Sequence, residues 1–481
     1  MSTQPSVRYE PVIGLEIHVQ LKTRTKMFCG CELGFGEPPN TRTCPVCLGL
    51  PGALPVANAE AIHLGLMIGL ALGCDLAPRS IFHRKNYFYP DLPKGYQISQ
   101  YDQPLCSGGE LGGVRITRVH LEDDAAKTIH AGSSGRIHGS SHSVVDFNRG
   151  GTPLAEIVTE PDVESAEQAG EFLRLLRTTL KALGVSDVDM SQGSLRCDAN
   201  ISIRPVGQTE LGTKTELKNM NSFRFIEQGI RAEIARQEAL LRAGETVEQE
   251  TLHFDPQTGA LTSMRSKEEA HDYRYFPEPD LTPITITPEM LERARAALPE
   301  LPAARAERFE ALGLHPDTAK LLAWRPELGD YFEEAVAAAG DGADVVAIAN
   351  LLANELLQRL DAEADPADSK VTAPALAQLV GLVAAKAVTG AGAKQVLDVL
   401  VAQGGDPAAI VEAQGLGAVG GEDALVPVVQ AALAANPDIA ERLKGGDMKP
   451  MGVIIGFVMK ETKGRADGKE VTKIVRSTLG L

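Results

Sequence analysis

The fold of the N-terminal half is decided by one stretch, Val12-Ile13-Gly14-Leu15-Glu16-Ile17-His18-Val19-Gln20-Leu21. Apolar and polar residues alternate along it, and a period of two is typical of a β-strand with one apolar and one polar face. Glu16 and His18, two side chains able to bind a metal ion, therefore share the polar face. For His18 alone, a hydrogen-bonded strand residue without a ligand is the alternative interpretation.

Four cysteines follow this strand in two close pairs, Cys29, Cys31, Cys44 and Cys47. Cys-x-Cys, twelve further residues and Cys-x-x-Cys supply four soft ligands that can close a tetrahedron around Zn²⁺. Because four protein ligands leave no position for water, we expect a structural zinc site rather than a catalytic one. The alternative is four thiols without metal, or a reducible disulfide.

The bulk composition predicts a soluble multi-domain protein. A chain of 481 residues is longer than one ordinary core, and its 43% apolar and 23% charged residues are typical of globular proteins. We expect a cytoplasmic location and no membrane span, because long apolar runs and a signal-peptide pattern are both missing from the sequence. Seven cysteines, three of them scattered, fit a reducing compartment better than a disulfide framework.

The charge is unevenly distributed. The net charge of −17 argues against indiscriminate nucleic-acid binding, which needs a basic surface. From residue 441 onward, nine basic residues accompany five acidic ones; nine minus five gives this segment +4 and leaves −21 for the rest. The C-terminal segment is therefore the part expected to meet a polyanion.

Residues 1–290 are predicted to combine strands and helices. Further alternating runs occur at 114–121 and 195–204, and helices are expected at 58–72, 165–183 and 222–243. Ser165 and Ser222 are suitable N-caps, and a glycine follows each helix. Strands and helices without a strict β-α-β rhythm favour an α+β fold with an antiparallel sheet.

From residue 287 onward the chain is rich in Ala, Leu and Glu and is predicted to be helical. The expected helices are 288–298, 302–312, 316–324, 328–339, 344–362 and 373–385, followed after a Gly-rich joint by 423–436 and 437–444. We therefore predict three domains, at 1–290, 291–405 and 406–481.

Acidic residues on three separate segments could hold Mg²⁺, a hard cation that prefers oxygen ligands. Besides the strand with Glu16, the segments are His120-Leu121-Glu122-Asp123-Asp124 and Asp146-Phe147-Asn148-Arg149-Gly150-Gly151-Thr152-Pro153-Leu154-Ala155-Glu156. The glycines and proline of the last segment indicate a backbone fitted closely to a ligand. For each acid taken singly, a solvated surface charge is the alternative.

The stretch 83–101 has the composition of a binding site. It holds much of the scarce aromatic content, interleaved with Arg84, Lys85 and Lys94. Aromatic faces can stack on bases, and cations can meet phosphates. A surface loop packed down by its tyrosines is the alternative.

A second binding stretch is predicted at 191–222. Asp198 and Asn200 alternate onto one strand face, and Glu216-Leu217-Lys218-Asn219-Met220-Asn221 leads into the helix that begins at Ser222. A helix N-terminus favours an anion. Capping and turn chemistry without a ligand is the alternative.

Familiar nucleotide and hydrolase motifs are missing from the sequence. It contains no Gly-x-x-x-x-Gly-Lys-[Ser/Thr], Gly-x-Gly-x-x-Gly, His-Glu-x-x-His or Gly-x-Ser-x-Gly pattern. Two rivals to a nucleotide-dependent enzyme are a non-catalytic zinc-knuckle RNA-binding adaptor and a metal-dependent nuclease or phosphohydrolase. The adaptor explains the basic tail but not the acids on three segments.

Together these motifs resemble one family, the B subunit of the tRNA-dependent amidotransferase GatCAB (the GatB/GatE family). The resemblance is carried by 12–21, the cysteine cluster, 83–100, 146–154, 195–200 and 216–222, and it runs essentially end to end. It implies a cradle domain with a mixed or antiparallel sheet and a zinc knuckle, followed by an all-α helical domain and an α-helical tail. The tail from about residue 408 is similar to the tRNA-binding tail shared with YqeY-like proteins.

The resemblance implies a two-step reaction with ATP, Mg²⁺ and structural Zn²⁺ as cofactors. ATP phosphorylates the side-chain carboxylate of Glu misacylated on tRNA(Gln), or of Asp on tRNA(Asn), because a carboxylate alone has no adequate leaving group. Ammonia released from glutamine by the amidase (glutaminase) subunit then displaces phosphate. The implied partners are this amidase, GatA, with the small protein GatC in a heterotrimer, the misacylated tRNA and, as a further candidate, the non-discriminating aminoacyl-tRNA synthetase.

The resemblance also implies roles for single residues. The family's Mg²⁺ positions correspond to Glu16, His18, Glu122, Asp123 and Glu156, of which Glu16, His18, Asp123 and Glu156 are the expected catalytic residues. The expected ATP and aminoacyl-end residues are Lys85, Tyr87, Lys94, Asp198, Asn200, Glu216, Lys218 and Asn221. The expected tRNA-binding residues of the tail are Lys449, Lys460, Lys463, Arg465 and Lys469.

One departure concerns Asp123. Many members read Glu-Glu-Asp where this chain has Glu122-Asp123-Asp124, so Asp123 is one methylene shorter at an expected ligand position. We expect Asp123 either to bind through water or to be replaced by Glu122, and to converge with Glu156 on the first strand.

Overall fold

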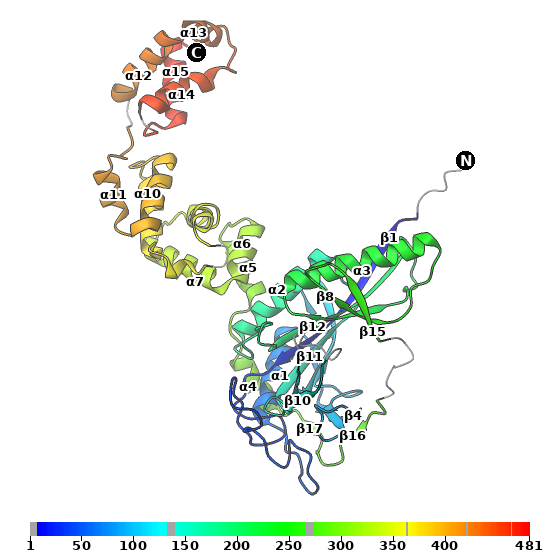
Figure 1. Cartoon of the computed structure of the whole chain (residues 1–481). Helices are drawn as coiled ribbons and strands as arrows, with labels where there is room; N and C mark the ends of the chain where they lie inside the picture. The colour runs from blue at the N-terminus through cyan, green and yellow to red at the C-terminus, as the bar shows by residue number, and fades with distance from the viewer. Residues whose placement is uncertain (1–6, 132–139, 266–272, 362–363, 420–421, 463) are drawn as a thin grey trace, which may run out of the picture. The chain divides into compact units, whose positions relative to one another are not determined.

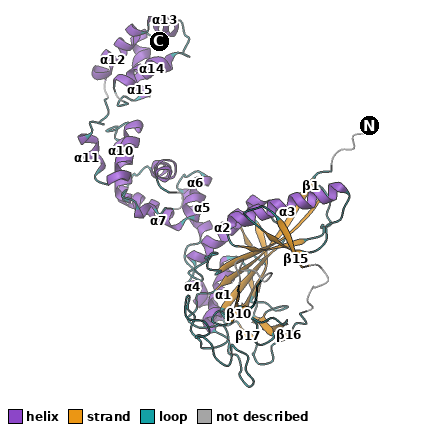
Figure 2. Ribbon diagram, viewed as in Figure 1, coloured by secondary structure: helices purple, strands orange, loops and turns teal. Residues whose placement is uncertain are grey.

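The computed structural model describes residues 7–131, 140–265, 273–361, 364–419, 422–462 and 464–481. The chain forms two compact units, Met1–Pro302 and Ala303–Leu481. The first combines sheets with helices and the second is helical, which confirms the predicted α+β class with a helical C-terminal part (Figure 1, Figure 2). The division into three domains stays a prediction.

A ten-stranded sheet forms the centre of the first unit, and the alternating N-terminal stretch lies in its middle. From edge to edge its strands are β15 (Leu261–Arg265), β14 (Thr251–Phe254), β13 (Thr215–Met220), β12 (Leu195–Pro205), β1 (Tyr9–Gln20), β11 (Pro153–Thr159), β8 (Val114–Asp123), β6 (Cys106–Ser107) and β2 (Asp75–Leu76), with β7 (Glu110–Leu111) paired to β8. Strands β13 and β14 are parallel, and the other neighbouring pairs are antiparallel. The prediction of a mixed, mainly antiparallel sheet is confirmed.

Short strands form three smaller sheets in the same unit. They are β16 (Phe276–Pro277), β4 (His83–Asn86) and β5 (Tyr96–Ser99); β10 (Ser143–Asp146) and β9 (Lys127–His130); and β17 (Ile284–Thr285) with β3 (Arg79–Ser80). Strand β5 contacts β8, so the aromatic stretch lies beside the large sheet.

Helices α1 (Ala59–Ala71), α2 (Ala166–Ala182) and α3 (Phe223–Ala243) pack on the apolar face of the sheet. They begin after the caps Asn58, Ser165 and Ser222, whose side chains accept backbone N–H bonds. Glycines allow the close approach: a Cβ on Gly65 of α1 would lie 2.6 Å from Leu105, and one on Gly229 of α3 would lie 3.1 Å from the sulfur of Met220. Helices α2 and α3 lie side by side (Figure 1). The apolar residues of β1 are therefore covered, and its polar residues project to the opposite face.

The described helices outside this layer include counterparts of those predicted and four that were not predicted, at 390–403, 407–413, 451–461 and 468–479. They are α4 (Pro288–Ala296), α5 (Pro302–Ala311), α6 (Pro316–Trp324), α7 (Pro326–Ala339), α8 (Val345–Leu351), α9 (Ala373–Ala384), α10 (Gly390–Gln403), α11 (Pro407–Ala413), α12 (Glu422–Ala435), α13 (Pro437–Lys444), α14 (Met451–Glu461) and α15 (Gly468–Leu479). Within the described residues, none is long and apolar enough to cross a membrane.

One predicted helix differs. The segment 344–362 was expected to be a single helix, but α8 ends at Leu351 and continues as a π-helical turn, Leu352–Leu356, and a 3₁₀ turn, Leu357–Arg359. Leu352 and Leu356 are both fully buried, so the wider turn keeps both leucines in the core.

Two hydrophobic cores lie in the second unit. One gathers residues 306–416 around Phe309 and Phe332, and the other gathers residues 425–475 around Leu425 and Ile454. The basic tail thus has an apolar core of its own, which leaves its lysines free to face solvent.

Candidate active site

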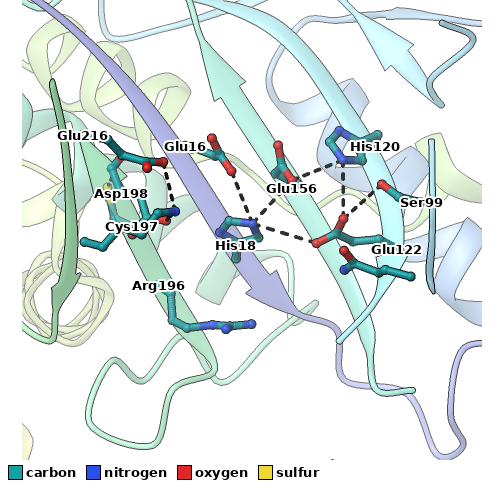
Figure 3. A network of polar contacts seen from close by, with 12 residues as sticks. Glu16, His18, Ser99, His120, Glu122, Glu156, Arg196, Cys197, Asp198 and Glu216 are labelled. Carbon is teal, nitrogen blue, oxygen red and sulfur yellow. Dashed lines mark hydrogen bonds and ion pairs between the residues drawn. The ribbon is translucent and has the colours of Figure 1, made fainter. Parts of the chain in front are cut away.

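The polar face of β1 meets the polar faces of β11 and β8 in one cluster (Figure 3). In the strand register His18 pairs with Glu156 of β11, and Glu156 pairs with His120 of β8. Opposite residues of antiparallel strands project to the same side, so these side chains and Glu122 lie together. His18 Nε2 lies 3.4 Å from Glu156 Oε2 and 3.8 Å from Glu122 Oε1.

Glu122, Glu156 and His120 are almost completely buried and the His18 side chain is 17% exposed, so the charges of this cluster must balance. Burial raises the pKa of Glu156, but His120 and His18 outweigh burial and hold that pKa well below its usual range. Burial lowers the pKa of His120, but Glu156 and Glu122 outweigh it and raise that pKa to about 9. The carboxylates are therefore ionised, and the histidines supply positive charge that a divalent cation can replace.

His120 is a site residue that the sequence interpretation missed. Its Nε2 lies 3.3 Å from Glu156 Oε2 and 3.8 Å from Glu122 Oε2, and its side chain exposes 4% of its surface. The signal was present, because a period of two along β8 puts His120 on the same face as Glu122.

Two groups of metal-capable side chains share His18. In each group the candidate ligand atoms lie within 4.8 Å of one another, and the groups are His18 with Glu122 and Glu156, and His18 with Glu16 and Asp198. Burial raises the pKa of Glu16, and the nearby Glu156 adds to the effect. Carboxylates and an imidazole at this spacing fit a hard divalent cation.

Strands β12 and β13 add a cation beside these groups. Lys218 Nζ lies 2.8 Å from Asp198 Oδ2 and 2.9 Å from Glu216 Oε1. Asn200 follows on the same strand face, opposite Glu216 in the register. Asn221 is exposed, next to the cap residue Ser222. Five of the predicted binding residues therefore come from β12, β13 and the start of α3, and Asp198 is the one that is grouped with Glu16 and His18.

Asp123 does not converge with Glu156, which corrects our expectation. Because side chains alternate along β8, Asp123 projects away from Glu122. Its carboxylate accepts a hydrogen bond from Lys94 Nζ and another, of 2.8 Å, from the backbone N–H of Ile98. Glu122 therefore occupies the position in the cluster that we had expected one of the two acids to fill.

Lys94 and Asp123 line a cavity of about 190 Å³. Its wall also includes Lys26, Cys47 and Gly151. Burial raises the pKa of Asp123, although the Lys94 ammonium opposes this effect. The predicted binding residue Lys94 thus lies in a separate buried ion pair rather than in the carboxylate cluster.

Lys85 and Tyr87 lie among tyrosines that the sequence interpretation did not include. Lys85 Nζ lies 4.9 Å from the ring centroid of Tyr273, and the Tyr87 and Tyr273 centroids are 5.8 Å apart. Burial lowers the pKa of Lys85, but Glu122 and other acidic groups raise it overall, so Lys85 is charged. The tyrosine-rich run after residue 272 was the available signal, but only the pairing of β16 with β4 brings it here.

The four predicted zinc ligands come together. The sulfur atoms of Cys29, Cys31, Cys44 and Cys47 lie within 4.8 Å of one another. The backbone N–H of Cys44 donates to Cys47 Sγ at 3.2 Å, and the buried Lys26 Nζ lies 3.6 Å from the same sulfur. Hydrogen bonding from Cys29 lowers the pKa of Cys47 to about 4. Four thiols at this spacing, with a cation beside one, fit a tetrahedral Zn²⁺.

The predicted tail residues differ in exposure. Lys449, Lys460 and Lys469 are exposed, whereas Arg465 is partly buried and donates from Nε to the Thr462 carbonyl at 3.0 Å. Lys463 lies outside the described residues. Three lysines are thus available to a polyanion, and Arg465 also braces the local backbone.

Comparison with known proteins identifies the family. The GatB/GatE catalytic domain matches residues 11–292, and the GatB domain matches residues 330–479. The chain belongs to the GatB/GatE family.

Curated members of the family are similar over almost their whole length. The chain is 50% identical to the B subunit of the aspartyl/glutamyl-tRNA(Asn/Gln) amidotransferase of Frankia casuarinae, over 98% of this chain and 96% of that protein. It is 49% identical to the protein of the same name from Anaeromyxobacter sp. strain K, over 99% of this chain and 100% of that protein. It is 46% identical to the protein of the same name from Persephonella marina, over 98% of this chain and 100% of that protein.

Proposed function

We propose that this chain is the B subunit of an aspartyl/glutamyl-tRNA amidotransferase, in which it carries the ATP-dependent activation step. The observation that carries the proposal is the buried cluster of His18, Glu122 and Glu156, with Glu16 and Asp198 alongside. Ionised carboxylates gathered on one sheet face next to lysines suit a nucleotide bound through a divalent cation. Near full-length similarity to proteins with this name supports the same function.

In the activation step, the side-chain carboxylate of a misacylated Glu or Asp attacks the γ-phosphorus of ATP. The bond from γ-phosphorus to the β,γ-bridging oxygen breaks, and ADP leaves with its electron pair. His18, Glu16, Glu122, Glu156 and Asp198 would hold Mg²⁺, which when bound neutralises the triphosphate and aligns the transfer. Lys218 places further positive charge beside this cluster, and Lys85 lies near enough for Glu122 and Glu156 to raise its pKa.

In the second step, ammonia attacks the acyl carbon of the activated side chain and phosphate departs, leaving an amide. The amidase GatA would release the ammonia from glutamine, and the small protein GatC would complete the heterotrimer. The exposed tail lysines Lys449, Lys460 and Lys469 would bind the tRNA phosphates, whose attraction weakens with salt. Zn²⁺ on the four cysteines would brace the loop next to the Lys94 cavity without entering the chemistry.

The test is phosphate release by the purified heterotrimer with Glu-tRNA(Gln) or Asp-tRNA(Asn). We expect Glu156→Gln to abolish the release while tRNA still binds, because the substitution removes a charge at the centre of the cluster. Arg231→Gln on the exposed surface of α3 serves as the control. Absence of tRNA-stimulated phosphate release in the wild type would refute the proposed function.

A further inference from the structure

Arg196 lies on the polar face of β12, directly opposite His18 in the strand register. Its Nη2 donates a hydrogen bond of 2.9 Å to Asp124 Oδ1. Asp124 follows the end of β8, and the strand order is β12, β1, β11, β8, so the arginine side chain reaches across the neighbouring strands. Figure 3 shows it extending below His18 toward the Glu122 side of the cluster.

Much of the hydrogen-bonding capacity of this guanidinium is unused. Arginine carries several N–H donors in a planar fork, and the bond to Asp124 is the single hydrogen bond that the Arg196 side chain makes within the described part of the chain. Its Nε is buried and has no hydrogen-bond partner among the described residues. The side chain as a whole is 40% exposed, so its free Nη–H groups, rather than the enclosed Nε–H, are the donors that a ligand can reach.

The two arginines beside Asp124 carry more positive charge than this one carboxylate balances. Asp124 accepts a second hydrogen bond, of 2.7 Å, from Gln20 Nε2, and its Oδ2 lies 3.7 Å from Arg149 Nε. One carboxylate thus faces two guanidinium groups and an amide. The polar face therefore has a positive end at Arg196 and a negative end at the carboxylate cluster.

An anion that is also bound to a divalent cation fits between these two ends. Its metal-bound oxygens would meet the carboxylate cluster, and its remaining oxygens would meet the guanidinium. A phosphoryl group has this form, and arginine is suited to it because two parallel N–H groups match two phosphoryl oxygens.

We propose that Arg196 binds the γ-phosphoryl group of ATP as it is transferred, and so is a further catalytic residue. This inference rests on the proposed function. As the carboxylate oxygen bonds to γ-phosphorus and the bond to the bridging oxygen breaks, ADP takes the electron pair and no proton needs to move. Arg196 counters the negative charge of the transferred oxygens through its exposed Nη–H groups, and Asp124 positions the guanidinium.

The test compares Arg196→Met and Arg196→Lys in the purified heterotrimer. Arg204→Met is the matched control, because Arg204 lies on the same strand, pairs with Glu10 and lies away from the cluster. Calorimetry measures the binding of Mg-ATP and Mg-ADP, and phosphate release is measured in the presence of misacylated tRNA. We expect Arg196→Met to slow release about 1,000-fold, the scale of an arginine in phosphoryl transfer. ATP affinity should fall at least about 10-fold and ADP affinity less than about 3-fold, since one good charged contact changes affinity on this scale.

The remaining variants separate the possible roles. Arg196→Lys should keep most of the ATP affinity but not the rate, because an ammonium lacks the planar fork. Phosphate release at the wild-type rate in either variant would overturn the inference. So would equal losses of ATP and ADP affinity together with a lower melting temperature, which would assign Arg196 to supporting Asp124. A wild-type heterotrimer without phosphate release would refute the proposed function rather than the role of Arg196. If Arg196→Met does not fold, the rate and the ATP affinity of Arg196→Lys test the role of Arg196.

Discussion

The substitution His120→Gln should remove a pH-dependent contribution to the stability of the first unit. Glutamine keeps an amide nitrogen near the position of Nε2, which lies 3.3 Å from Glu156 Oε2, but it cannot carry a proton charge. Because the pKa of His120 rises on folding from 6.5 to about 9, protonation favours the folded state. This contribution is complete below about pH 6.5 and is lost as the pH rises through about 9.

The size of the effect follows from the pKa shift. One pKa unit corresponds to about 1.4 kcal/mol, so a rise from 6.5 to about 9 corresponds to about 3 kcal/mol. Urea denaturation in EDTA, at pH 6 and pH 9.5, gives the free energy of unfolding of the wild type and the variant. We expect the wild-type advantage over His120→Gln to shrink by about 3 kcal/mol between the two pH values.

Two comparisons make this prediction decisive. His142 is exposed, and His142→Gln should differ from the wild type by the same small amount at both pH values. Saturating Mg²⁺ should reduce the pH dependence of the wild type, because the cation takes over the charge that His120 supplies. A difference between wild type and His120→Gln that stays constant within about 0.5 kcal/mol would refute the assigned charge balance.

Three further outcomes are expected. Cys44→Ser combined with Cys47→Ser should lower zinc from about one per chain to near zero in elemental analysis, and unchanged zinc would refute the four-thiol site. Lys94→Met should destabilise the first unit by about 3–5 kcal/mol in urea denaturation, since it leaves Asp123 buried without its cation, and adding Asp123→Asn should restore much of the loss. Ending the chain after Gln403 should weaken tRNA binding in a filter assay at low salt but leave ATP affinity unchanged, and tRNA affinity equal to that of the full chain would show that the tail is not the anchor.

Local periodicity was enough to predict much of the fold. Alternation along 12–21 predicted β1 and placed Glu16 and His18 on one face, and the caps at Ser165 and Ser222 predicted where α2 and α3 begin. These features depend on neighbouring residues alone. The same period of two also separates Glu122 from Asp123, and the expectation that Asp123 converges with Glu156 was wrong because it did not apply that rule.

The rest of the candidate site depends on which strands become neighbours. Arg196 can reach Asp124 because β12 and β8 belong to one sheet, separated by β1 and β11. Tyr273 approaches Lys85 because the neighbouring strand β16 pairs with β4. Pairings between segments so distant in the chain leave no periodic signal in either segment. Sequence patterns therefore predicted the faces of the strands but not the contacts between them.

The central position of β1 affects how the chain can fold while it is being synthesised. The strand ends at Gln20, but its two partners, β11 and β12, end at Thr159 and Pro205. At about 5–20 residues per second, the ribosome completes the second partner roughly 10–40 s after β1 has been made. During that interval an apolar strand edge is exposed without its partners, and such edges pair readily with other chains. The arrangement that gathers His18, Glu122 and Glu156 at the middle of the sheet therefore leaves the nascent chain open to aggregation through this edge until about residue 205 has been made.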